Sequence, residues 1–346
     1  MSQQTVSRRH LVPLSVLDLA PVPEGTPPSM ALRRITDLAR LAERLGYVRY
    51  WFAEHHAMPS VASSAPEVLI AHVASATTTL RVGSGGIMLP NHAALKVAEV
   101  FHTLQALYPD RIDLGIGRAP GGVSGVTRAL RALRGDQAAA QLAELFAYSR
   151  GESPLSTPYA SVHAEPSDVS LPPVWLLGSS GASAAMAGQS GLGYSFASHF
   201  SPEPAAPAML DYRRHFKPSA AFAAPHALLG VAVVCAPTDA EADYLAGTLD
   251  LMWLRIQSGQ FRPLPDPRAV ADYPFEPYER EAIAEHRRQM IVGSPRTVRE
   301  RLLQLAADTQ ADELMIVSNL YDHAERLRSY ELLSQAMSVD DDAADP

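Results

Sequence analysis

The chain has 346 residues, 47% of them hydrophobic, and a net charge of −8 from 29 Lys and Arg against 37 Asp and Glu. Nucleic-acid-binding domains usually carry an excess of positive charge, which this acidic chain does not have. No apolar run reaches the roughly 18 residues expected of a membrane span. The single cysteine, Cys235, excludes an internal disulfide framework and sites built from several cysteines. We therefore expect a cytoplasmic protein that has neither nucleic acid nor a membrane as a partner.

Strand and helix signals alternate through the first half of the chain. An apolar run at 11–17 predicts a strand, and the helical spacing at 30–45 ends before Gly46, which is placed as a C-terminal cap. The alternation continues with strands at 47–53, 80–89 and 111–117, and with helices that begin at Pro66, span 94–108 and lie within 126–148.

The second half repeats this alternation, with two irregular stretches at 151–173 and 259–278 that we expect to shape a substrate pocket. The predicted strands are 174–177, 192–197, 227–235 and 313–317, and the predicted helices follow 177, span 239–256, begin near Ser294 and span 322–337. Eight such units favour a (β/α)8 TIM barrel with insertions. We expect one domain over residues 1–338, followed by an acidic, disordered tail at 339–346.

Two glycine-rich stretches, GSGG at 83–86 and GIGRAPGG at 115–122, invite comparison with dinucleotide-binding loops. Neither fits, because the glycine spacing is wrong and Pro120 interrupts the second stretch. The first stretch lies inside a predicted strand, where glycines mark either a bulge or the close approach of another molecule. A flat ring against bare backbone and a bulge without a ligand both remain possible interpretations.

Polar side chains follow several of the predicted strands. Glu54, His55 and His56 end the second strand, but neighbouring residues on a strand point to opposite faces, so we predict no metal site there. One of the two histidines could act as a general base at the barrel mouth, and the other as a hydrogen-bonded core residue.

Either an anion site or a glycine-rich helix N-cap without a ligand is predicted where the fifth strand gives way to a helix. Gly178, Ser179, Ser180, Gly181 and Ser183 would place free backbone N–H groups and hydroxyls at the positive end of that helix. Arg118, after the fourth strand, could add a forked contact to a phosphate, although an ordinary surface ion pair would explain it equally. His199 and Asn319 could also line the mouth.

With these residues placed, the chain resembles the bacterial luciferase-like flavin-dependent monooxygenases, specifically their alkanal-monooxygenase-like single-component branch. The resemblance runs from about Leu11 to Met337, and its most specific segments are WFAEHH, RVGSGGIMLPNHAALKVAE, DRIDLGIGRAPG, VWLLGSS and ADELMIVSNLYDHAERL. It implies a barrel that binds reduced FMN as a co-substrate, with the flavin ring over the third strand.

The resemblance also implies roles for individual residues. Ser84, Gly85 and Gly86 would lie under the ring, with a non-prolyl cis peptide expected between Ser84 and Gly85. The FMN phosphate would be held by the side chains of Arg118, Ser180 and Ser183 and by the backbone of Ser179. His55 would be the catalytic residue. Gly117 stands where the luciferase α subunit carries a reactive cysteine, so light emission is not expected.

The implied activity is oxygenation of a small organic substrate by reduced FMN and O2 through a flavin peroxide. A separate NAD(P)H:flavin reductase would supply the reduced flavin, and a homodimer is expected by analogy. Two alternatives remain: an F420-dependent oxidoreductase that transfers hydride on the same barrel, and a flavin-binding protein without catalytic activity.

Overall fold

A computed structural model describes residues 9–118, 124–132, 137–152, 162–199 and 204–339 of the chain. The four aspartates of the predicted acidic tail, at 340–342 and 345, lie outside these ranges. Within the described residues, no helix combines the length and the apolar character needed to cross a membrane.

Strands from the whole length of the chain form a single sheet that closes on itself as a parallel barrel. In chain order the strands are β1 (Leu14–Asp18), β2 (Arg49–Phe52), β3 (Arg81–Ser84), β4 (Ile87–Met88), β5 (Ile112–Gly117), β6 (Val174–Gly178), β7 (Gly193–Ala197), β8 (Ala227–Cys235), β9 (Met290–Gly293) and β10 (Glu313–Val317). Pairing of β10 with both β1 and β8 closes the ring. β4 continues β3 along β5, and β9 is an extra strand on the last part of β8.

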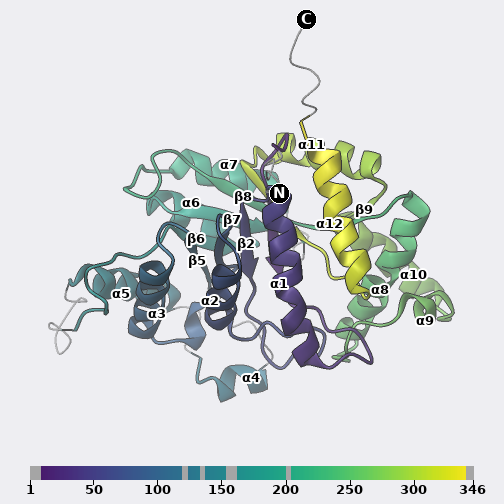
Figure 1. Ribbon diagram of the computed structural model, residues 1–346, viewed down its shortest axis with the longest axis horizontal. Helices are drawn as coiled ribbons and strands as arrows, with labels where there is room; N and C mark the ends of the chain where they lie inside the picture. Colours follow the sequence, from purple (N-terminus) through teal and green to yellow (C-terminus); the bar gives the residue numbers. More distant parts are fainter. Residues whose placement is uncertain (1–8, 119–123, 133–136, 153–161, 200–203, 340–346) are drawn as a thin grey trace, which may run out of the picture.

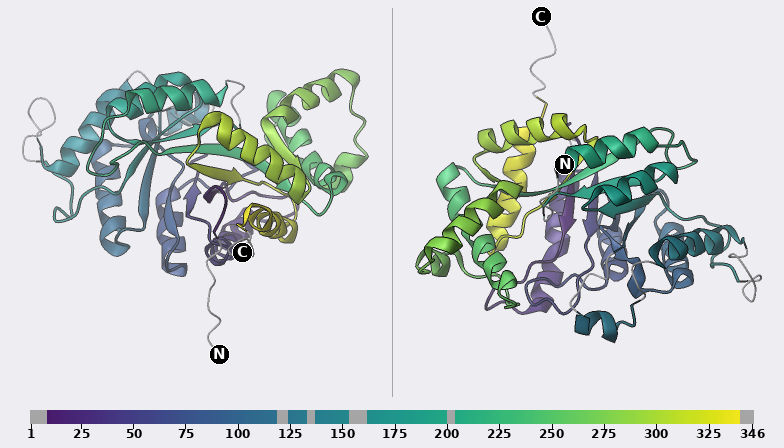
Figure 2. Two further views of the ribbon diagram at one scale, coloured as in Figure 1. Left: turned by 90° about the horizontal axis from the view of Figure 1, so that it is seen from above. Right: turned by 180° about the vertical axis from the view of Figure 1, so that it is seen from behind.

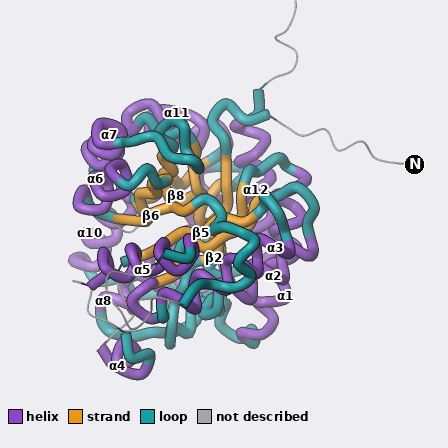
Figure 3. Tube along the Cα trace, turned by 90° about the vertical axis from the view of Figure 1, so that its left-hand side faces the viewer, coloured by secondary structure: helices purple, strands orange, loops and turns teal. Residues whose placement is uncertain are grey.

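Helices surround the strands on the outside of the barrel (Figures 1 and 3). The helices of the first half are α1 (Pro28–Arg44), α2 (Pro66–Ala76), the short 3-10 turn η1 (Leu89–Asn91), α3 (Ala94–Leu107), α4 (Ser124–Ala129) and α5 (Ala138–Arg150). Those of the second half are α6 (Gly181–Gln189), α7 (Ala205–His215), α8 (Asp239–Gln257), α9 (Pro267–Ala271), α10 (Pro277–His286), η3 (Arg287–Gln289), α11 (Pro295–Thr309) and α12 (His323–Met337). Proline begins α1, α2 and α11, as expected where an N–H would have no helical partner.

The predicted (β/α)8 barrel is confirmed, since all eight predicted strands are present. One difference lies between β8 and β10, where the stretch predicted as irregular contains α9 and the start of α10, and β9 comes after it. Together with α8 these elements form a lobe at one side of the barrel (Figure 2). The sequence analysis also missed α7, and the single helical stretch predicted at 126–148 is divided into α4 and α5.

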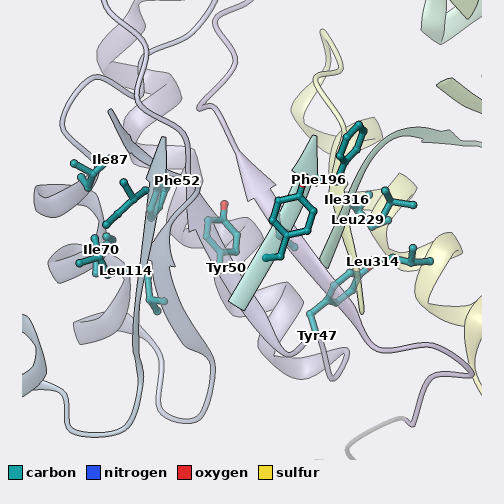
Figure 4. Close-up of a cluster of buried hydrophobic side chains, with 14 of the residues drawn as sticks. Tyr47, Tyr50, Phe52, Ile70, Ile87, Leu114, Phe196, Leu229, Leu314 and Ile316 are labelled. Atoms are coloured by element: carbon teal, nitrogen blue, oxygen red, sulfur yellow. The ribbon is translucent and has the colours of Figure 1, made fainter. Parts of the chain in front are cut away.

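The core divides into two layers because successive strand residues face opposite sides of the sheet. Tyr50 and Phe52 of β2 point outward into the main cluster between strands and helices, where Phe196 also lies (Figure 4). Trp51, between them, belongs to the inner cluster that fills the barrel together with Trp175. The two tryptophan rings meet edge to face, with their centroids 5.5 Å apart.

A buried ionic network lies at the opposite end of the barrel from the carboxyl ends of the strands. The guanidinium of Arg49 donates to Glu313 at 2.7 and 3.0 Å and to Asp113 at 2.8 Å, and Arg81 also donates to Asp113 at 2.6 Å. Burial alone would raise the pKa of Glu313, but the charge of Arg49 lowers it to about 2. The network ties β2, β3, β5 and β10 together.

Candidate active site

The main cavity opens at the carboxyl ends of the barrel strands and has a volume of about 700 Å³. Residues from the first five strands and their loops line one part of it: Leu17, Leu19, Trp51, Ala53, Glu54, His55, Met58, Gly85, Gly86, Met88, Gly117 and Arg118. The later elements contribute Leu177, Gly178, Ser179, Ser180, Ser195, Ala197, His199, Leu249, Met252, Trp253, Ile256, Leu264, His286, Met290, Met315, Val317 and Asn319, among others. This position is where TIM-barrel enzymes carry their active sites.

His55 lies in the loop that leaves β2 and lines the cavity. Its backbone N–H donates to the carbonyl of Ser63 at 2.9 Å, which fixes the loop, while its Nδ1 atom is buried without a hydrogen-bond partner among the described residues. Burial, with a smaller effect from His56, lowers the pKa of His55 below its ordinary value of 6.5. A neutral imidazole that lines the cavity suits proton transfer near pH 7.

Glu54 fastens the two loops that frame this part of the cavity. Its buried carboxylate accepts hydrogen bonds from His56 at 2.8 Å, the Met88 backbone at 2.8 Å, Asn91 at 3.0 Å and His92 at 3.0 Å. Burial alone would raise the pKa of Glu54, but the hydrogen bond from His92 and those from the other donors keep it below its ordinary value. The EHH segment therefore supplies two cavity residues: His55, and Glu54, whose carboxylate is held in a cluster of hydrogen bonds. Within the described ranges, no group of three or more His, Cys, Asp and Glu could hold a metal ion.

The glycine floor, Gly85–Gly86, lies where β3 passes into β4. The non-prolyl cis peptide expected between Ser84 and Gly85 is found one residue later, between Gly85 and Gly86. The earlier placement was wrong because β3 still pairs regularly with β2 at Ser84, so the departure from strand geometry begins only afterwards. A Cβ on Gly86 would lie 2.7 Å from the carbonyl oxygen of Gly115, and one on Gly85 would lie 2.7 Å from the side chain of Leu17.

Two of the predicted site residues do not line the cavity. The Oγ of Ser84 is fully buried and bonds the backbone of Gly115, donating to its carbonyl at 2.8 Å and accepting from its N–H at 3.0 Å. The Oγ of Ser183 is also buried, and it donates to the Ser180 carbonyl at 3.2 Å and lies 3.4 Å from the hydroxyl of Tyr194. These serines connect neighbouring elements beneath the cavity surface.

Hydrogen-bond donors of the cavity wall gather at the β5 and β6 side. Arg118 follows β5 and lines the cavity, and its buried Nε has no hydrogen-bond partner among the described residues. Ser179 and Ser180 line the same wall, and Ser180 is the N-cap of α6 although its side chain makes no capping hydrogen bond. A guanidinium beside a helix N-terminus is complementary to a phosphate group.

Another wall is formed by the lobe between β8 and β10, of which the sequence analysis connected only the stretch 259–278 with a substrate pocket. Trp253 of α8 stacks on His286 at the end of α10, with the ring centroids 4.5 Å apart and the planes 16° apart. Both residues line the cavity. Their separation by 33 positions along a stretch without a recognisable motif left no sequence signal for this contact.

Comparison with known proteins places the chain among relatives of nearly the same length. The family model for luciferase-like monooxygenases matches residues 12–331. A luciferase-like monooxygenase of Escherichia coli (strain K12) is 42% identical over 324 residues, covering 93% of this chain and 96% of the relative. An N-acetyl-S-alkylcysteine monooxygenase of Bacillus subtilis (strain 168) is 33% identical over 338 residues, covering 94% and 98%.

Solved structures agree with this placement. The crystal structure of apo-MsnO8 is 43% identical, with a TM-score of 0.85, and covers 94% of this chain and 98% of its own. More distant structures, at 18% and 13% identity, include a monooxygenase component in complex with FMN and a dehydrogenase holding an F420 adduct, so the same fold accepts either cofactor. From the matched range and these relatives, the chain belongs to the luciferase-like monooxygenase family.

Proposed function

We propose that the protein is an FMN-dependent monooxygenase that uses reduced FMN and O2 to oxygenate a small organic substrate. The observation that carries the proposal is the arrangement of one continuous cavity. It joins Arg118, whose buried Nε has no partner among the described residues, and the N-terminus of α6 to the glycine floor and to the imidazole of His55.

The residues present fit an FMN molecule. Arg118, Ser179 and Ser180 would hold its phosphate, and its ring would lie against the backbone of Gly85 and Gly86, which line the cavity without side chains. Ser84 and Ser183 would act indirectly, by fixing β5 beside the floor and the first turn of α6 beside the phosphate.

Reduced FMN supplies the electrons that activate O2, and a separate NAD(P)H:flavin reductase would provide it in the reduced state. The protein contributes binding, orientation and a largely apolar enclosure that excludes water. His55, neutral at pH 7, would accept or return a proton through its imidazole ring, which lines the cavity. Glu54 would keep His55 in place by holding its loop to η1.

The experiment that tests the cofactor is a titration of the purified protein with FMN, reduced FMN and F420. We expect reduced FMN to bind more tightly than F420, and a preference for F420 would overturn the proposal in favour of hydride transfer. Arg118→Met should weaken FMN binding by about tenfold or more, since a hydrogen bond to a charged group contributes about 1.5–3 kcal/mol. Arg296→Met, on the exposed surface of α11, is the matched control and should leave FMN binding unchanged.

A homodimer is proposed on the face formed by α2 and α3. Val68 of α2 is 61% exposed and Leu107 of α3 is 63% exposed, and both border a shallow groove between these helices. Large apolar side chains gathered on one face are typical of a protein interface. Sedimentation should therefore give a dimer that Val68→Glu weakens. A monomeric wild-type protein would contradict this part of the proposal.

A further inference from the structure

The assignment of FMN to the β5 and β6 side leaves one part of the cavity without a role. This part, the apolar end, is formed by residues of α8, its neighbouring segments and β9: Leu249, Met252, Trp253, Ile256, Leu264 and Met290. His286 completes it from α10. Of these seven side chains, five are aliphatic or thioether groups. The indole N–H of Trp253 and the imidazole of His286 are the hydrogen-bonding groups.

The stacked pair of Trp253 and His286 gives the apolar end a flat aromatic wall. The Nδ1 atom of His286 is buried and has no hydrogen-bond partner among the described residues. Burial, with a smaller effect from Arg287, lowers the pKa of His286. The ring therefore offers a single neutral hydrogen-bonding group beside apolar surface.

Within the described part of the chain, the cavity wall has no charged side chain left to bind a charged substrate. Among the described lining residues, Glu54 and Arg118 are the permanently charged ones. Glu54 is surrounded by its own donors, and Arg118 is assigned to the flavin phosphate. The three histidines on the wall, His55, His199 and His286, all have a pKa below the ordinary value because of burial, so they add no positive charge at pH 7.

We infer that the apolar end is the substrate subsite, and that it selects an uncharged molecule with an apolar body and one hydrogen-bonding group. Trp253 would contact the apolar body and His286 the polar group, which makes both specificity-determining residues. The inference rests on the proposed function, because it needs the flavin to occupy the other end. A carboxylate substrate would lose its hydration without gaining a cation, and it would share the cavity with the negative charge of Glu54.

A matched pair of aryl methyl sulfides tests this inference by binding alone, without turnover. The pair is 4-(methylthio)benzamide, which is neutral, and 4-(methylthio)benzoate, which is anionic. Calorimetric titration into the protein loaded with the oxidised form of whichever flavin it binds should show the amide binding at least about tenfold more tightly, given the cost of burying an unpaired carboxylate.

Substitutions in the aromatic wall test whether Trp253 and His286 determine the preference for the neutral compound. Trp253→Ala should weaken amide binding about tenfold through lost aromatic contact, while Trp253→Phe should retain most of it. His286→Leu should weaken the amide but not thioanisole, which lacks the polar group, and His286→Gln should restore part of the loss. Tyr244→Ala, on the exposed side of α8, is the control and should change neither.

Three results would overturn the inference: benzoate binding as tightly as the amide, no detectable binding of either compound, or a loss of flavin affinity in Trp253→Ala equal to the loss of amide affinity. The last result would assign the apolar end to the cofactor. A failure of the proposed function itself appears separately, as a preference for F420 in the cofactor titration, and does not depend on the sulfide pair.

Discussion

His55 is the residue on which the catalytic proposal depends, and its substitution by glutamine separates catalysis from binding. His55→Gln keeps a polar side chain of similar length but removes the titratable nitrogen. We expect turnover to fall by about 10²–10⁴-fold, the usual contribution of general acid–base catalysis. Substrate-dependent oxygen consumption, measured alongside FMN affinity, checks this.

The control is His163→Gln, an exposed histidine far along the chain whose removal should leave turnover unchanged. Equal activity of the wild type and His55→Gln would favour the non-catalytic flavin-binding alternative, or would assign the proton to another group. His199 is the first residue to test in that event, because it lines the same cavity.

The lowered pKa of His55 fixes the sign of the pH dependence. A base must be unprotonated to act, and burial shifts its protonation to a pH below 6.5. Turnover that requires this base should therefore stay level through neutrality and decline only on the acid side of the ordinary histidine value. A decline that begins above pH 7 in rate measurements with saturating substrate would contradict the role.

Burial of His199 makes a separate prediction about stability. Desolvation lowers its pKa from 6.5 to about 4 in the folded protein. The unfolded chain therefore binds more protons between these values, so this contribution is fully present above pH 6.5 and is lost as the pH falls toward about 4. In urea unfolding, His199→Asn should reduce the dependence of the unfolding free energy on pH within that window. An unchanged pH slope would show that His199 does not control it.

At the scale of single residues, the sequence predicted which residues lie near the cavity better than it predicted where their side chains point. His55, Arg118, Ser179 and Ser180 line the cavity as expected. Ser84 was expected beneath the ring on its position in a glycine-rich strand, but strand alternation turns its hydroxyl toward β5. Moving a residue by one position along a strand places its side chain on the opposite face of the sheet. The position at which β3 ends is a backbone feature that has no sequence signature of its own.

At the scale of elements, regular periodicity and capping residues predicted the barrel strands and most of their helices. The segment from β8 to β10 was harder, because α9 has only five residues and β9 only four. β9 forms by pairing with the last residues of β8, a long-range contact that local periodicity cannot reveal. The apolar end of the cavity belongs to this same segment, and only its part within 259–278 was expected at the substrate pocket.

The break between β3 and β4 leads to a prediction about Gly86. A methyl group there would lie 2.7 Å from the Gly115 carbonyl oxygen, which is backbone and cannot rotate away. We expect Gly86→Ala to destabilise the protein by about 1–3 kcal/mol, the usual cost of forcing extra volume into a packed site, and to weaken FMN binding. Urea unfolding and flavin titration measure the two effects.

Gly125 provides the control for this substitution, because a Cβ there would meet no atom within 4 Å. Gly125→Ala in α4 should be neutral or slightly stabilising, since alanine favours helix over glycine by about 1 kcal/mol. If both alanine variants behave alike, the glycine floor is not sterically constrained.

At the scale of the whole molecule, the ionic network at the barrel base holds four strands together. Arg49→Met leaves the buried carboxylates of Glu313 and Asp113 without their shared partner, and we expect a loss of about 3–5 kcal/mol in unfolding free energy. Arg296→Met removes an exposed pair with Glu300, and should cost less than about 1 kcal/mol.

Chemical denaturation at pH 7 compares these two arginine variants directly. Similar losses in both would mean that the buried network is not the stronger determinant of stability. A loss confined to Arg49→Met, with FMN affinity retained, would show that the base of the barrel stabilises the fold independently of the cavity at its other end.

The lobe between β8 and β10 gives this fold a modular character. The proposed flavin contacts come from β3, β5 and β6, whereas the apolar end comes from one later, continuous stretch of chain. Grafting residues 239–290 from another family member should therefore exchange the preferred substrate while conserving the cofactor. On this proposal, substrate selectivity and flavin binding would be encoded in separate parts of the sequence.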